Sequence, residues 1–315
     1  MIANRQGRAY FLADGGLDEA AVSQSREALA AYSQAVRLRP DYAEAYNNRG
    51  NVKSNLGHHE EAVADYDRAV HLKPDLADAY INRANAKAAL GQFQDALVDL
   101  ETAISFNPDN VFAFLNRGLL LVELGQFEDA IADLDEAVRL EPEFERAYIV
   151  RGSVKSALNR SQEAIADYDR AIGLNPDNSE AHNSRGLLQV ELGRYEAAVA
   201  DYALAIRMRP GYAAAYNNRG VAQAKLGRLG AAVDDYDEAV RLQPEIAEPY
   251  FNRGNAKERQ GELEEAIADY DQVILRRPDD IEAYRNRAVV KAELGRTEEA
   301  RSDFDRALAI VAGRL

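Results

Sequence analysis

The sequence lacks several features that would assign it to a particular compartment or chemistry. It contains no cysteine, which excludes disulfide bonds and thiolate metal sites and permits a reducing cytoplasm. It has no run of about 18 apolar residues, so no membrane span is expected. The stretch from Met1 to Gly16 has no apolar core of the kind found in secretory signals. We therefore expect a cytoplasmic protein.

Positively charged residues are outnumbered by negatively charged ones. The 315 residues include 38 lysines and arginines against 53 aspartates and glutamates, a formal net charge of −15. An acidic surface repels phosphate backbones, so nucleic acid is not an expected partner. Hydrophobic residues make up 47% of the chain and charged residues 29%, a balance typical of a chain that is folded almost throughout.

Proline is rare but regularly placed. Eight of the nine prolines follow one another at intervals of 34 residues: Pro40, Pro74, Pro108, Pro142, Pro176, Pro210, Pro244 and Pro278. The same interval separates a series of alanines: Ala62, Ala96, Ala130, Ala164, Ala198, Ala232, Ala266 and Ala300. It also separates a series of glycines, with one asparagine: Gly57, Gly91, Gly125, Asn159, Gly193, Gly227, Gly261 and Gly295. Glycine and asparagine tolerate the left-handed conformation that ends a helix, so this series predicts helix ends within a repeated unit.

Each repeat is expected to be a pair of helices. In residues 43–76, apolar side chains recur at helical spacing over 45–56 and again over 62–70. This predicts two helices of about twelve to fourteen residues joined by a short turn. Proline ends the second helix. The small residues Gly50 and Ala62 allow the two helices to approach closely.

This pattern resembles the tetratricopeptide repeat family over nearly the whole chain. The motif of that family appears here at Tyr46, Gly50, Ala62, Tyr66, Ala69 and Pro74. The resemblance implies an all-α, right-handed superhelical solenoid whose first helices line the concave side. We expect eight full repeats over 43–314, preceded by a degenerate N-terminal repeat or cap over 1–42 with a connection that contains Gly15 and Gly16.

Two charged positions recur in every full repeat. The first helix has arginine where the family usually has leucine: Arg49, Arg83, Arg117, Arg151, Arg185, Arg219, Arg253 and Arg287. The second helix has aspartate: Asp65, Asp99, Asp133, Asp167, Asp201, Asp235, Asp269 and Asp303. These residues lie at similar heights in an antiparallel pair, so we expect bidentate ion pairs between the helices. A row of arginines that binds an anionic ligand is the alternative.

Asparagine precedes that arginine in six repeats, at Asn48, Asn82, Asn116, Asn218, Asn252 and Asn286. Asparagine is a poor helix former, and its amide both donates and accepts hydrogen bonds, which suits it to holding a peptide backbone. The row resembles the repeat arm of O-linked N-acetylglucosamine transferases, where an asparagine ladder holds target peptides. No glycosyltransferase domain is expected in this chain. The alternative is that these asparagines bond to a neighbouring helix.

The side chains level with the asparagine row are the other candidate ligand contacts. In one repeat they are polar: Glu44, Asn47, Asn48 and Asn51. Two repeats later they are mainly apolar: Phe112, Leu115, Asn116 and Leu119. Exposed apolar groups commonly mark an interaction site. We expect an apolar anchor for a ligand at Phe112, Leu115 and Leu119, with Asn82 and Asn116 beside it. A tightly wound superhelix that covers these side chains is the alternative.

Nothing in the sequence indicates catalysis, a metal or a cofactor. His59 and His71 are twelve residues apart, roughly 18 Å along a helix, which is too far for shared coordination. Asp65 and Asp67 diverge by about 200° around a helix and cannot share a proton or an ion. We therefore expect no enzyme activity.

The last repeat has a charged residue, Arg301, where earlier repeats have an apolar one, but Phe304, Leu308 and Val311 stay apolar. We expect this partly capped face to support weak self-association. The function that the sequence favours is a scaffold or adaptor that binds an extended peptide or protein segment in the concave groove. The alternative is the targeting arm or a fragment of a glycosyltransferase-like enzyme complex whose catalytic part lies elsewhere.

Overall fold

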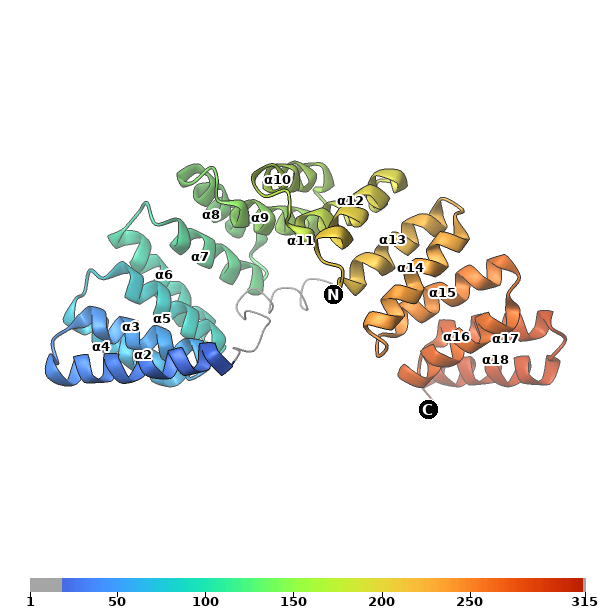
Figure 1. The fold of residues 1–315 in the computed structure, drawn as a ribbon, viewed down its shortest axis with the longest axis horizontal. Coiled ribbons are helices and arrows are strands. Elements are labelled where there is room, and N and C mark those ends of the chain that lie inside the picture. The colour runs from blue at the N-terminus through green and yellow to red at the C-terminus, as the bar shows by residue number, and fades with distance from the viewer. Residues whose placement is uncertain (1–18, 314–315) are drawn as a thin grey trace. The chain divides into compact units, whose positions relative to one another are not determined.

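The computed structural model describes residues 19–313, with side chains from residue 23 onward. Over this range the chain forms seventeen α-helices joined by short turns and contains no strand (Figure 1). The all-α class is thereby confirmed. The predicted connection at Gly15 and Gly16 lies outside the described residues.

The chain divides into two compact units, Met1–Arg170 and Ala171–Leu315, and the division falls within helix α10 (Ser161–Leu174). The other helices of the first unit are α2 (Glu19–Leu38), α3 (Ala43–Asn55), α4 (His59–Leu72), α5 (Ala77–Ala89), α6 (Phe93–Phe106), α7 (Val111–Glu123), α8 (Phe127–Leu140) and α9 (Glu145–Ala157). Those of the second unit are α11 (Ser179–Glu191), α12 (Tyr195–Met208), α13 (Ala213–Lys225), α14 (Leu229–Leu242), α15 (Ala247–Gln260), α16 (Leu263–Arg276), α17 (Ile281–Glu293) and α18 (Thr297–Val311).

The turn inside each helix pair contains one residue in the left-handed backbone conformation, as the glycine series predicts. The seven glycines of that series have φ between 70° and 81°, and Asn159, which replaces the eighth, has φ 58°. A side chain with a Cβ is strained at such an angle, and asparagine tolerates it better than most residues. The 34-residue pattern therefore identified the ends of the first helices correctly.

Close contact between the two helices of a pair depends on a glycine opposite a tyrosine. A Cβ placed on Gly50 would lie 2.6 Å from Cε1 of Tyr66, and Tyr66 itself is 1% exposed. The repeats that have alanine at the glycine position, Ala84 and Ala288, have Leu100 and Phe304 at the tyrosine position. In these two repeats the Cβ of the alanine therefore faces a side chain other than tyrosine.

Within each unit the pairs stack in sequence order. The second helix of one pair packs against the first helix of the next, as α4 does on α5 and α14 on α15. Successive first helices also contact one another, α3 with α5 and α7 with α5 in the first unit and α13 with α11 and α15 in the second. First helices therefore line the side of each stack on which the helices are most closely spaced.

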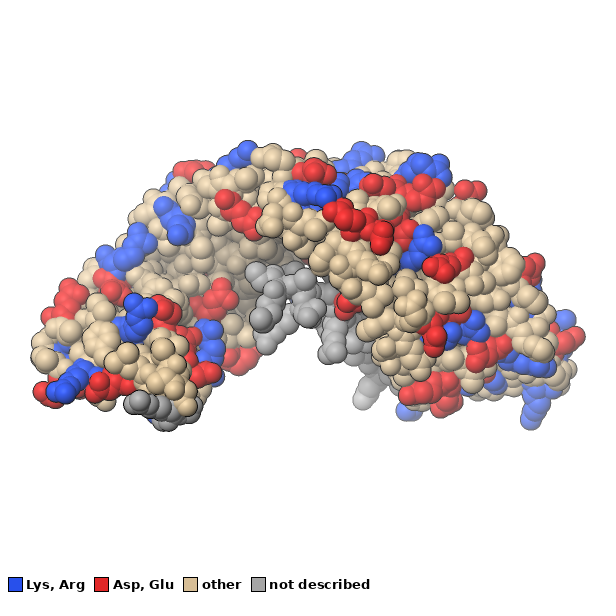
Figure 2. Space-filling view, turned by 180° about the vertical axis from the view of Figure 1, so that it is seen from behind, with Lys and Arg blue, Asp and Glu red and all other residues tan. Residues whose placement is uncertain are grey.

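Charged side chains of both signs are interspersed on the face of the molecule drawn in Figure 2. No helix of the described residues is long and apolar enough to cross a membrane.

Candidate functional site on the first helices

We call the set of side chains equivalent to Glu44, Asn47, Asn48 and Asn51 in each repeat the first-helix face. It lies on the closely spaced side of each stack, where sequence analysis placed the ligand. Its geometry depends on the polar network beneath it, which we describe first.

Each of the eight recurring arginines binds the aspartate of its own repeat through two atoms, as predicted. Nη2 lies 2.5–2.6 Å from Oδ1 in every pair. Nε donates to the carboxylate at 2.7–3.0 Å. The aspartates are only 3–6% exposed. Because all eight guanidinium groups bind buried carboxylates, this row is part of the helix packing, and it does not support the alternative of an anion-binding row.

Two further partners of these pairs were not predicted from the sequence. Five repeats have a lysine one turn after the arginine, whose Nζ lies 2.7–3.1 Å from the same aspartate: Lys53, Lys87, Lys155, Lys257 and Lys291. In four repeats Nη1 of the arginine also donates to an aspartate of the preceding repeat, as Arg83 does to Asp67 at 2.6 Å. The lysines and this second aspartate recur at the 34-residue interval, which is the signal that could have revealed them.

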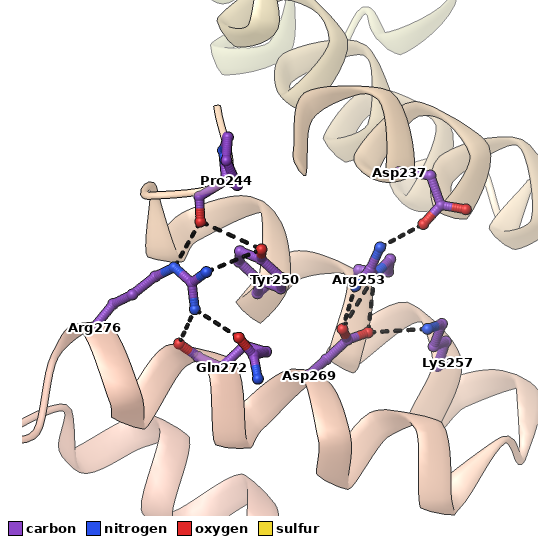
Figure 3. Close-up of polar contacts among 8 residues, drawn as sticks. All are labelled: Asp237, Pro244, Tyr250, Arg253, Lys257, Asp269, Gln272 and Arg276. Atoms are coloured by element: carbon purple, nitrogen blue, oxygen red, sulfur yellow. Dashed lines mark hydrogen bonds and ion pairs between the residues drawn. The ribbon is translucent and has the colours of Figure 1, made fainter. Parts of the chain in front are cut away.

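Figure 3 shows one complete network. Arg253 lies between Asp269 of its own repeat and Asp237 of the preceding one, and Lys257 binds Asp269 from the other side. The two aspartates of one second helix, such as Asp269 and Asp271, therefore bind different arginines: Arg253 of the same repeat and Arg287 of the next. The second contact links neighbouring repeats.

The electrostatic environment of the aspartate varies with these partners. The hydrogen bonds that Arg49 donates to Asp65 raise the pKa of Arg49. Burial raises the pKa of Asp235 against the lowering effect of Arg219, and Gln223 occupies the lysine position of that repeat. Burial also acts to raise the pKa of Asp303, but hydrogen bonds from Arg287 and Lys291 lower it overall.

Most asparagines of the predicted row bond to the preceding repeat. Nδ2 of Asn82 donates to Oδ1 of Asn47 at 3.0 Å, and Asn218 and Asn252 make the same bond to their preceding repeats at 3.1 and 2.9 Å. Asn286 donates instead to Asn255 at 3.0 Å. Bonding to a neighbouring helix, which the sequence left open, is therefore what the structure shows for four of the six.

The remaining predicted asparagines differ from these four. Asn47 is 8% exposed and donates weakly to Asn48 at 3.5 Å. Asn51 accepts the hydroxyl of Tyr66 at 2.8 Å. Asn116 is half-buried, and no side-chain hydrogen bond joins it to another residue of 19–313.

The expectation that Leu115 and Leu119 are exposed was wrong. Leu115 is 1% exposed and Leu119 is 6% exposed, and both pack with Leu134 of α8 and Val154 of α9. Their positions face the neighbouring helices, so a leucine there adds to the core. Phe112 is different: it is 57% exposed, and its ring meets the edge of Phe144 with centroids 5.5 Å apart.

In four repeats an aromatic side chain of the first helix bonds to the proline carbonyl in the loop before it: Tyr80, Tyr148, His182 and Tyr250. In Figure 3 the hydroxyl of Tyr250 donates to the carbonyl of Pro244 at 3.3 Å, and Arg276 donates to the same carbonyl at 2.7 Å. His182 occupies the equivalent position in its repeat, is 3% exposed, and has Nε2 3.0 Å from the carbonyl of Pro176. It is therefore a packing residue.

Comparison with protein families gives the class of the protein. Models of the tetratricopeptide repeat match residues 43–76, 77–110, 115–179, 150–213, 184–245 and 253–314, and a further TPR repeat model matches 24–57. The chain belongs to the tetratricopeptide repeat family. A comparison with curated proteins found none that matches.

Solved structures share the fold. A tetratricopeptide repeat protein from Parabacteroides merdae is 21% identical, with a TM-score of 0.57 over 79% of this chain and 98% of that one. The Cut9–Hcn1 hetero-tetramer structure of the APC/C aligns with a TM-score of 0.60 at 16% identity, over 89% of this chain and 52% of the other. YrrB, described as a TPR protein with an unusual peptide-binding site, is 24% identical over 58% of this chain and 95% of its own, with a TM-score of 0.51.

Proposed function

We propose that this protein is an interaction scaffold that binds an extended segment of another protein on the first-helix face and performs no chemistry of its own. The observation that carries the proposal is Phe112. It exposes 57% of its surface at a position where five of the other seven full repeats have an acidic residue, such as Glu44 or Glu248. Packing within the repeat does not need an aromatic ring there, and a large exposed apolar side chain is a common contact for a partner.

Two further points support the proposal. The first-helix face is the closely spaced side of each stack, so side chains from successive repeats lie within reach of one extended ligand. The fold also carries a peptide-binding site in YrrB. The likeness of the asparagine row to the repeat arm of O-linked N-acetylglucosamine transferases stays part of the proposal, limited by the bonds that four of those asparagines make within the chain.

Phe112→Glu tests the proposal, because sibling repeats already have glutamate at this position and the fold tolerates it. Wild-type and variant protein would be used to capture partners from the native host, and the captured proteins would be identified by mass spectrometry. A partner that binds the wild type in stoichiometric amount and is lost with the variant supports the proposal. An enzyme in that role would identify the chain as a targeting arm. Equal capture by both proteins would rule Phe112 out.

A weaker contact is proposed for α18. Phe304, Leu308 and Val311 are 40%, 66% and 67% exposed, an apolar strip that supports weak association between copies. Light scattering should show an average mass that rises with protein concentration for the wild type but not for Phe304→Ser with Leu308→Ser. A mass that stays at the monomer value at high protein concentration would contradict this proposed contact.

A further inference from the structure

The asparagines of the first-helix face differ in whether the fold already uses them. An asparagine equivalent to Asn48 can donate a hydrogen bond to an asparagine equivalent to Asn47 in the preceding repeat. Asn82 donates to Asn47 in this way. In the last repeat, where the preceding repeat has Phe251 at the Asn47 position, Asn286 donates instead to Asn255, at the Asn51 position. An asparagine at the Asn51 position also accepts the hydroxyl of a buried tyrosine, as Asn255 does from Tyr270 at 2.8 Å.

Asn85 and Asn116 occupy the same two repeat positions as Asn255 and Asn286, yet they have none of these partners. Ile81 stands where Asn116 would find its first acceptor, and Leu100 stands where Asn85 would meet a tyrosine. Within residues 19–313 neither side-chain amide makes a hydrogen bond to another residue. Neither is among the described buried polar atoms that lack a partner, and both residues are half-buried, so their amides keep some solvent-accessible surface.

Phe112 lies beside them. It is one turn before Asn116 on α7, and residues four apart share one face of a helix. The ring of Phe112 meets that of Phe144, the residue that precedes α9 of the following repeat, and is otherwise largely exposed. We call Asn85, Asn116 and Phe112 the α5–α7 patch.

The polar groups of the patch are uncharged amides that both donate and accept hydrogen bonds. Each amide can donate through nitrogen and accept through oxygen, which matches the N–H and C=O groups of a peptide backbone whatever its side chains are. An extended segment presents those groups unpaired, whereas a helix or a sheet has already used them. The exposed ring of Phe112 offers an apolar surface next to the amides.

From this arrangement we infer that the α5–α7 patch is the principal binding position of the protein. Asn85 and Asn116 bind the backbone of one extended peptide segment, and Phe112 receives an apolar side chain of that segment. The inference rests on the proposed function and adds to it the place and the ligand chemistry. The asparagine row as a whole is not the ligand site, because its other members hold neighbouring repeats together.

A phage-displayed library of twelve-residue peptides provides the probe. Peptides selected on the wild-type protein would be synthesised with a fluorophore, and their affinity for each variant measured by anisotropy. Asn116→Ala removes one amide. Ile81→Asn keeps Asn116 but supplies the internal acceptor that Asn82 has in Asn47. Asn286→Ala is the matched control, because Asn286 holds the same repeat position but is already bonded.

We expect Asn116→Ala and Ile81→Asn each to weaken binding about tenfold or more, and Asn286→Ala to change it less than twofold. Circular dichroism would confirm that each variant is folded. If Ile81→Asn fails to fold, Ala84→Gly with Leu100→Tyr takes its place, since it gives Asn85 the tyrosine partner that Asn51 has in Tyr66.

The possible failures separate the two claims. Peptides that bind the wild type but bind Asn116→Ala equally well would overturn the α5–α7 patch and leave the interaction scaffold standing. A selection that yields no peptide with measurable affinity for the wild type would count against the scaffold itself, and the patch would fall with it.

Discussion

The glycine opposite each buried tyrosine gives the sharpest test of how the repeats pack. A Cβ added to Gly220 would lie 2.6 Å from Cε1 of Tyr236, well inside the roughly 3.5–4.0 Å at which carbon atoms make favourable contact. Tyr236 is 2% exposed, so its ring has no free space into which to move. Gly220→Ala should therefore force overpacking, which costs about 1–3 kcal/mol. The gain in helix propensity of about 1 kcal/mol offsets part of this. We expect a net loss of up to about 2 kcal/mol.

Gly230→Ala is the matched control. Gly230 is the second residue of α14 and has no atom within 4 Å of an added Cβ, so the same substitution meets no steric obstacle and should not destabilise the protein. Urea unfolding followed by circular dichroism would compare the two variants with the wild type. A second background, Tyr236→Leu, mimics the Ala84 and Leu100 combination that the chain already contains. There, Gly220→Ala should cost less than about 0.5 kcal/mol if the steric account is correct. The reasoning fails if the substitution costs the same in both backgrounds.

Two other substitutions should stabilise the fold by completing its internal pattern. The hydroxyl of Tyr202 is buried without a partner in the described chain, and Leu187→Asn supplies the acceptor that Tyr66 has. A double-mutant cycle with Tyr202→Phe should give a coupling of about 1 kcal/mol, and zero coupling would refute it. Gln223→Lys should place an ammonium beside Asp235, as the sibling lysines do, and raise stability more than Gln223→Met. Burial raises the pKa of Asp235 in the folded state, so ionisation of Asp235 opposes folding above its unfolded pKa of about 3.9. The added stability should therefore be present at neutral pH and vanish in acid. A pH-independent gain would contradict this account.

The sequence predicted the recurring parts of this structure because each of them repeats at one interval. Arg49, Asp65 and their equivalents lie at the same height in every repeat. Because guanidinium binds carboxylate preferentially, each arginine was expected to pair with the aspartate of its own repeat. Asn159 was assigned to a left-handed turn by its place among glycines, and its φ of 58° agrees.

The direction in which a side chain points could not be predicted in the same way. Leu115 and Phe112 both lie on α7, three residues apart, and the sequence placed both on the ligand face. In the structure Leu115 packs against α8 and α9 while Phe112 remains exposed. The difference depends on how far each repeat turns relative to the next, a property of stacking that the hydrophobic pattern of one helix does not contain.

The hydrogen bonds between asparagines could not be predicted from the sequence for a related reason. Whether an asparagine of the row bonds internally depends on the residues that the preceding repeat places near it, which include Asn47 for Asn82, Asn255 for Asn286 and Ile81 for Asn116. The row looks uniform along the sequence. Its members differ only when residues of neighbouring repeats are compared in pairs.

The central claim is that a partner segment lies on the first helices near Phe112. Photo-crosslinking tests it most directly, with p-benzoylphenylalanine introduced in place of Phe112 and, in a second protein, in place of Val98. Val98 is 52% exposed on α6, a second helix, and serves as an equally accessible control. In extracts of the native host, the account predicts a discrete crosslinked partner from position 112 and none from position 98. Crosslinking of the same partner from position 98 alone, or from neither position when that partner is shown to bind, would contradict it.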